Sequence, residues 1–114
     1  MITRKHRFHG YGSLRYVYQH GKTVRGQASS LKFISNPRRT TYRLAVVVSK
    51  KVSKSAVVRN RIRRRLYESI RRHEANITQP YDLVLTVFAE QMAVIPAEEL
   101  ESIVLDQLKQ AKII

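Results

Sequence analysis

Apolar residues recur at every fourth position across the middle of the chain. They are Val58, Ile62, Leu66 and Ile70, and Val57 and His73 extend the row at its two ends. This spacing predicts a helix that buries one narrow stripe of its surface. Ser55 is in position to cap the start of the helix. We expect the helix to end near Ala75 or Asn76, because Pro80 forbids its continuation.

Most of the positions around that stripe are basic. Seven arginines fall between Arg59 and Arg72, with one acid, Glu68, among them. The residues expected opposite the stripe are Asn60, Arg64, Tyr67 and Arg71. Such a density of like charge repels itself in water and becomes favourable beside a polyanion. A solvated helix surface is the alternative, but such surfaces normally have acids interleaved.

Three segments have the pattern of β-strands. Residues 26–35 alternate, with Leu31 and Phe33 on one side and Ser30, Lys32 and Ile34 on the other. Residues 42–49 contain an unbroken valine run, which predicts a central strand covered on both faces for part of its length. Residues 82–89 form a further buried strand after the helix. Strand, helix and strand together make a βαβ unit, so these last two strands are expected to run parallel.

Shorter helices are predicted towards the two ends of the chain. Ser13 caps a helix from Leu14 to about Gln19, and Gly21 ends it. A last helix begins at Pro96, and its inner face carries Leu100, Ile103, Val104, Gln107, Leu108 and Ala111. Half of the eight acids in the chain belong to this helix, namely Glu98, Glu99, Glu101 and Asp106. We expect that acidic patch to face away from a bound nucleic acid.

Length and charge narrow the class of protein. The 114 residues suit a single domain, residues 1–114, with one core. Lys and Arg total 22 against 8 Asp and Glu, which gives a net charge of +14 and indicates nucleic acid first and an anionic membrane second. There is no apolar run of membrane-spanning length and no apolar segment of a secretory signal. The absence of cysteine excludes disulfides and thiolate metal sites and fits a cytoplasmic protein.

The N-terminal segment, residues 1–11, interleaves basic residues with His6, Phe8, His9 and Tyr11. Basic and aromatic residues together are typical of a surface for single-stranded nucleic acid, where rings stack on bases. For residues 1–5 a flexible terminus is an equal alternative. Neither histidine has an acidic or cysteine neighbour, so no metal site is expected in the protein. No acid pairs with a histidine at a spacing that suggests acid–base catalysis, so we expect no catalytic residue in the protein itself.

Several short motifs follow one another between residues 48 and 64. They are Val48-Ser49-Lys50-Lys51 at the end of a strand, then Ala56-Val57, Arg59-Asn60-Arg61 and Arg63-Arg64. In this order they resemble the protein subunit of bacterial ribonuclease P. The likeness extends over most of the chain, to Val17-Tyr18 and Gly21 upstream and Tyr81-Asp82 downstream.

The resemblance implies an α+β fold, a two-layer α-β sandwich of the ribosomal-protein-S5-domain-2-like kind. It has a four-stranded mixed sheet, three helices and the order α-β-β-β-α-β-α. The βαβ crossover of that fold is left-handed, whereas nearly all such units are right-handed.

The resemblance also implies a function. In that family a large RNA uses magnesium to hydrolyse one phosphodiester bond of precursor tRNA, and the protein binds both this ribonuclease P RNA and the single-stranded 5′ leader of the precursor. We expect the protein to be monomeric without RNA and not to bind membranes. The matching RNA-binding positions are Ser49, Lys50, Lys51, Arg59, Asn60, Arg61, Arg63 and Arg64, and we add Arg65 and Arg71 from the same helix.

A cleft for the 5′ leader is implied around the first helix. The residues expected to form it are Phe8, Tyr11, Leu14, Tyr18, Lys32 and Phe33. The chain departs from the family pattern at Leu14 and Lys32, where aromatic residues are usual, and at Tyr67 and Phe88, where basic residues are. A ribosomal or general RNA-binding protein is the alternative function, since it explains the composition equally well but not the run of motifs.

Overall fold

The structure, a computed structural model, describes His6, the backbone of residues 11–13, and residues 14–114 in full. The elements are α1 (Tyr11–His20), β1 (Lys22–Arg25), β2 (Ser29–Ser35), β3 (Arg43–Val47), α2 (Ala56–Arg72), the 3₁₀ turn η2 (Glu74–Asn76), β4 (Tyr81–Val87), the 3₁₀ turn η3 (Glu90–Ala93) and α3 (Ala97–Gln110). This succession confirms the predicted order α-β-β-β-α-β-α.

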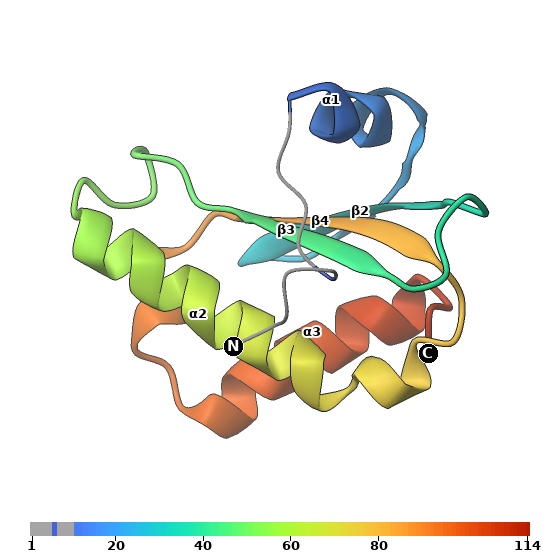
Figure 1. The fold of residues 1–114 in the computed structure, drawn as a ribbon. Coiled ribbons are helices and arrows are strands. Elements are labelled where there is room, and N and C mark those ends of the chain that lie inside the picture. Colours follow the sequence, from blue (N-terminus) through green and yellow to red (C-terminus); the bar gives the residue numbers. More distant parts are fainter. Residues whose placement is uncertain (1–5, 7–10) are drawn as a thin grey trace.

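The four strands form one mixed sheet in the order β1-β2-β4-β3. β2 pairs antiparallel with β1 and with β4, whereas β3 and β4 run parallel, with Leu44 opposite Leu83. Helices α2 and α3 cover one face of the sheet, and α1 crosses the other (Figure 1). The orientation in Figure 1 can be turned so that α2 faces the viewer and both parallel strands point up. In that view β4 lies to the left of β3, so the crossover from β3 through α2 to β4 is left-handed (Figure 1).

Two strand predictions made from the residue pattern were wrong. The first strand begins at Ser29 rather than residue 26, and the short, largely exposed β1 precedes it. The second strand, β3, is an edge strand and not a central one. Its valines are nevertheless covered on both faces, since Val46 packs in the main core and Val47 packs against the α1 side. Of the two parallel strands, β4 is the one inside the sheet, between β2 and β3, and it is buried along most of its length.

Helix α1 ends where the sequence predicts and begins earlier. It starts at Tyr11, so Ser13 occupies a position inside the helix rather than the predicted N-cap position. At the other end the Gly21 amide donates to the Val17 carbonyl at 2.8 Å. A Cβ atom on Gly21 would lie 2.6 Å from that carbonyl oxygen and 2.9 Å from the carbonyl oxygen of Phe33. Only glycine therefore allows the chain to turn so closely from α1 into β1.

The predicted stripe of α2 is the seam between this helix and the sheet. Ile62, Leu66 and Ile70 are at most 1% exposed. Ser55 caps the helix by accepting a hydrogen bond from the Val58 amide at 3.2 Å, as expected. Val57, predicted to extend the seam, is instead 75% exposed.

Tyr67 was predicted opposite the seam, and that prediction was wrong. Its ring is buried, and its hydroxyl oxygen accepts a hydrogen bond from the Val46 amide at 3.3 Å. Val46 belongs to the edge strand β3, whose outward amides have no neighbouring strand to bond with. Tyr67 thus satisfies a buried amide and widens the packed face of α2.

Arg65 joins α2 to the segment after β4. Its Nη1 donates to the Met92 carbonyl at 2.8 Å and its Nη2 to the Ile95 carbonyl at 2.5 Å. Met92 itself is 1% exposed and belongs to the main core. The guanidinium therefore stabilises the turn between β4 and α3.

Buried polar groups join other elements of the fold. The Ser29 hydroxyl donates to Oε1 of Gln107 at 2.8 Å, and Nε2 of Gln107 donates to the Ser29 carbonyl at 2.9 Å, which fixes α3 against β2. His6 stacks on Tyr42 with ring centroids 4.2 Å apart. The Tyr42 hydroxyl donates to Glu74 at 2.7 Å, and burial together with this carboxylate raises the pKa of Tyr42 well above its usual value.

Replacing Arg65 tests this structural role. We expect Arg65→Ala to lower the free energy of unfolding by about 1.5–3 kcal/mol, because charged hydrogen bonds to two carbonyls are lost. Arg61→Ala removes the same charge from an exposed position of the same helix and is expected to change stability by less than about 0.5 kcal/mol. Urea unfolding followed by circular dichroism measures both, and equal stability of the two variants would contradict the role.

Candidate nucleic-acid interface

The loop before α2 and the first half of the helix expose a group of basic and polar side chains. We call this group the α2 basic surface, and its residues are Ser49, Lys50, Lys51, Arg61 and Arg64, all exposed. Among the residues that the structure describes, no carboxylate forms an ion pair with any of them. Their charges are therefore directed at solvent and at whatever binds there.

Three more of the predicted RNA-binding residues, Arg59, Asn60 and Arg63, support this surface through hydrogen bonds within the protein. The Arg59 guanidinium donates to the Ser53 carbonyl at 2.9 Å, which holds the loop against the helix. Arg63 donates to the side-chain oxygen of Asn60 at 2.5 Å, one turn away. Arg59 and Arg63 are half-buried and Asn60 is exposed. The Arg59-Asn60-Arg61 motif thus combines loop positioning with exposed charge.

The helix backbone adds to the positive potential at this end. The first turn of α2 contains no acidic residue, which is unusual for the positive end of a helix. Amides at such a terminus point outward, and together with the dipole they favour phosphate. Arginine forks suit phosphate oxygens geometrically, so the first half of α2 has the chemistry of a phosphate-binding surface.

The second half of α2 differs, because its charges are paired within the protein. Arg71 donates to Glu68, and this hydrogen bond lowers the pKa of Glu68 to about 2. Arg72 lies 3.3 Å from Glu101, and His73 lies 2.8 Å from the same carboxylate. The hydrogen bond from His73 lowers the pKa of Glu101. One acid of α3 therefore faces α2, whereas Glu98, Glu99 and Asp106 are exposed.

Two residues predicted for RNA binding consequently stand apart from the α2 basic surface. The Arg65 guanidinium donates hydrogen bonds to the carbonyls of Met92 and Ile95, and Arg71 is paired with Glu68. Both were chosen because they share the helix with the motif. Glu68 lies three residues before Arg71 on the same helix, so helical spacing could have indicated that pair, whereas the carbonyls bound by Arg65 lie 27 and 30 residues away.

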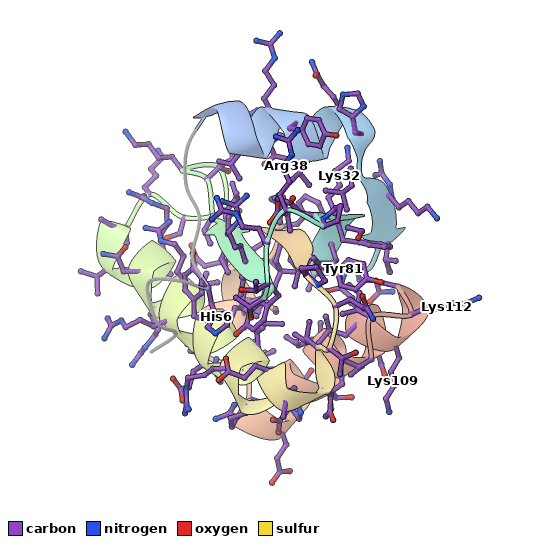
Figure 2. The ribbon with its side chains drawn as sticks, turned by 45° about the vertical axis from the view of Figure 1, so that its right-hand side comes forward. His6, Lys32, Arg38, Tyr81, Lys109 and Lys112 are labelled. Carbon is purple, nitrogen blue, oxygen red and sulfur yellow. The ribbon has the colours of Figure 1, made fainter. Side chains whose placement is uncertain are left out.

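A second candidate surface lies on the α1 side of the sheet. Tyr18 of α1 is 43% exposed, and the Lys32 ammonium lies 5.6 Å from the centre of its ring. This distance is within the range of a cation–π contact. On the sheet, Lys32 is flanked by Thr23 of β1 and Val84 of β4. Figure 2 shows Lys32 projecting on the side of α1. We call this pair the Tyr18–Lys32 surface.

Of the other predicted cleft residues that the structure describes, Leu14 lies on the same side of the sheet as Tyr18 and Lys32, and Phe33 does not. Leu14 is half-buried and packs with Val17, Ala45 and Val84 under α1. Phe33 lies on the opposite face of the sheet, against the main core, with its ring 6.2 Å from that of Tyr81. Grouping Phe33 with Tyr18 and Lys32 was therefore wrong, because alternation along β2 points Phe33 and Lys32 to opposite faces of the sheet. Phe8 and the side chain of Tyr11 lie outside the described residues.

Two exposed aromatic residues were not predicted as site residues. Phe88 follows the end of β4 and is 53% exposed, although the pattern assigned it to a buried strand. Tyr16 is 54% exposed on α1. The sequence signal for the exposure of Tyr16 was its position two residues before Tyr18 on a helix, because residues at that spacing point to different sides.

No group of three His, Asp or Glu side chains that could hold a metal ion occurs among the described residues. In the described part of the chain, no helix is long and apolar enough to cross a bilayer.

Comparisons with known proteins agree with this arrangement. The family model for ribonuclease P matches residues 2–112. A ribonuclease P protein component from Pseudanabaena sp. is 36% identical over 87 residues, which are 76% of this chain and 75% of that protein. The ribonuclease P protein component of Brevibacillus brevis is 30% identical over 111 residues, 97% of this chain and 86% of that protein.

Solved structures show the same fold. The RNase P protein of Staphylococcus aureus superposes with a TM-score of 0.84 at 23% identity, covering 95% of this chain and 96% of that one. The RNase P protein from Thermotoga maritima gives a TM-score of 0.81 at 22% identity, covering 91% and 96%. With the family match over nearly the whole sequence, these findings establish that the chain belongs to the family of ribonuclease P protein components.

Proposed function

We propose that the chain is the protein subunit of a ribonucleoprotein ribonuclease P and assists removal of the 5′ leader from precursor tRNA. The observation that carries the proposal is the α2 basic surface, a cluster of exposed cations that has no carboxylate partner among the described residues. A polyanion is the partner that such a surface lacks. Membership of the ribonuclease P family indicates that this polyanion is the RNA subunit.

Binding at the α2 basic surface would be electrostatic. Each phosphate that a lysine or arginine neutralises releases counterions, so the affinity falls steeply as salt rises. Such contacts fix the position of the RNA and carry little sequence information. Arg59 and the Asn60–Arg63 pair support this by holding the loop and the helix surface in one arrangement before RNA arrives.

Recognition of the precursor would use the Tyr18–Lys32 surface. A leader base can stack on the exposed ring of Tyr18, while the Lys32 ammonium lies close enough to contact a neighbouring phosphate. Stacking of this kind tolerates different bases, which suits leaders of varied sequence. Mature tRNA has no leader, so this surface would distinguish the two tRNA forms.

The proposal assigns the chemistry to the RNA subunit and a positioning role to the protein. Magnesium would be held chiefly by RNA, because phosphate oxygens and water are the hard ligands that it prefers. The large positive charge would keep the protein monomeric until it meets RNA, since like-charged copies repel one another. A ribosomal or general RNA-binding role is the alternative from a different class.

Reconstitution separates these two functions. The purified protein is mixed with a ribonuclease P RNA and a 5′-labelled precursor tRNA at low magnesium. We expect release of the leader only when both the protein and the RNA are present. A general RNA-binding protein would bind the same RNAs without promoting cleavage, and that result would contradict the proposal.

Removing one exposed charge tests the RNA contact. Arg61→Ala is expected to weaken binding to the ribonuclease P RNA and to reduce the slope of log affinity against log salt by about 0.7–0.9, the value for one phosphate contact. Filter binding at several salt concentrations measures both quantities. Lys109→Ala is the matched control, because it removes one charge from the far end of α3 (Figure 2). Equal slopes for the two variants would remove Arg61 from the interface.

Tyr18 provides a test of leader recognition. Tyr18→Ala is expected to weaken binding of precursor tRNA to the assembled enzyme by roughly 5- to 150-fold, which corresponds to about 1–3 kcal/mol for one stacked base. Binding of mature tRNA should not change. Tyr18→Phe keeps the ring and is expected to behave like the wild type. Equal weakening of both tRNA forms by Tyr18→Ala would exclude Tyr18 from the leader site.

A further inference from the structure

A cavity of about 490 Å³ opens beside α1, between the turn that follows β2 and the first residues of β3 and β4. Its lining includes Tyr16, Asn36, Pro37, Arg38, Arg43 and Asp82. Tyr16 and Tyr18 are two residues apart on a helix and so project about 200° from each other. The cavity, which we call the Tyr16 pocket, is thus separate from the Tyr18–Lys32 surface.

The polar end of the pocket is rigid and electrically balanced. Arg43 donates from Nε and from Nη2 to the two carboxylate oxygens of Asp82, each at 2.9 Å. Asn36 donates to Asp82 as well, at 2.9 Å. The side chains of Arg43 and Asp82 are only 13% and 6% exposed. Asp82, the one acid that lines the pocket among the described residues, is therefore neutralised by Arg43.

The open side of the pocket combines an aromatic ring with unneutralised positive charge. Tyr16 is 54% exposed, and its ring lies 4.6 Å from that of His20, which supports it from within the same helix. Arg38, which lines the pocket, and its neighbour Arg39 are exposed, and neither has an ion-pair partner among the residues described here. Figure 2 shows Arg38 extending from the turn towards α1.

This combination identifies a class of ligand. We propose that the Tyr16 pocket binds one nucleotide of single-stranded RNA, with its base against the ring of Tyr16 and its phosphate on Arg38. Aromatic rings beside arginine are the recurring surface for unpaired nucleotides. The volume falls in the range of about 300–1,000 Å³ that small-molecule pockets occupy. The inference rests on the proposed function in that the nucleotide belongs to an RNA of the ribonuclease P complex.

Binding of an eight-residue oligouridylate to the purified full chain gives the first test. We expect Tyr16→Ala to weaken binding at least 5-fold, Tyr16→Phe to match the wild type, and Arg38→Ala to weaken binding and flatten the salt dependence. Lys109→Ala controls for loss of one charge. The midpoint of thermal unfolding should stay unchanged, since Tyr16 and Arg38 are exposed. Wild-type affinity in both Tyr16→Ala and Arg38→Ala would overturn the proposal.

Photocrosslinking in the assembled complex locates the nucleotide. Precursor tRNA or ribonuclease P RNA carrying 4-thiouridine is irradiated, and the crosslinked peptide is mapped by mass spectrometry. A crosslink at Tyr16 or within residues 36–39 from either RNA supports the pocket and shows which RNA supplies the nucleotide. Crosslinks confined to the α2 basic surface and the Tyr18–Lys32 surface would overturn it.

Different results would contradict the proposed function and the Tyr16 pocket. If reconstituted cleavage succeeds while Tyr16→Ala and Arg38→Ala bind the oligonucleotide normally, only the Tyr16 pocket is wrong. If cleavage is not promoted but those variants lose binding, the pocket is a nucleotide site and the proposed function is wrong.

Discussion

The structure depends on the contact between the apolar seam of α2 and the sheet. Ile62, Leu66 and Ile70 are removed from water there, and burial of such side chains contributes about 1.5–3 kcal/mol each. That gain offsets the repulsion among arginines that share the same helix. Without the seam, no apolar burial would offset the repulsion among the arginines, and the helix would not stay folded in the absence of RNA. The sheet therefore acts as the support that presents positive charge in a fixed geometry.

Charge along α2 is used in two ways. Towards the end of the helix, carboxylates of Glu68 and Glu101 neutralise Arg71 and Arg72, and Arg65 binds backbone carbonyls. Near the start, Arg61 and Arg64 have no carboxylate partner among the described residues. One helix thus combines a structural half, which joins α2 to α3 and η3, with a half that remains available for phosphate. Affinity for RNA and stability of the fold can change separately as a result.

The residue pattern predicted the three helices, three of the four strands and the seam, but it missed β1 and did not give the neighbours of each element. The four-residue spacing located α2 and the buried side chains of Ile62, Leu66 and Ile70 correctly, because that pattern is local. The position of β3 at the edge and the burial of Tyr67 depend on which element lies alongside, and Tyr67 binds an amide 21 residues away in the chain. Arg65 likewise bonds to carbonyls 27 and 30 residues away. Alternation along β2 placed Phe33 and Lys32 on opposite faces of the sheet, but only the packed structure shows which of the two faces α1 covers.

The uneven placement of acids has a consequence for how the protein meets its partner. Exposed Glu98, Glu99 and Asp106 lie on α3, whereas the start of α2 carries arginines and the positive end of the helix. Charge is therefore distributed unevenly among the elements of the molecule, in addition to its net positive value. In the field of an RNA the molecule would experience a torque that turns the cationic end forward before any contact forms. Productive collisions would then be more frequent than random tumbling allows, and this advantage would fade once the Debye length shrinks below the size of the protein.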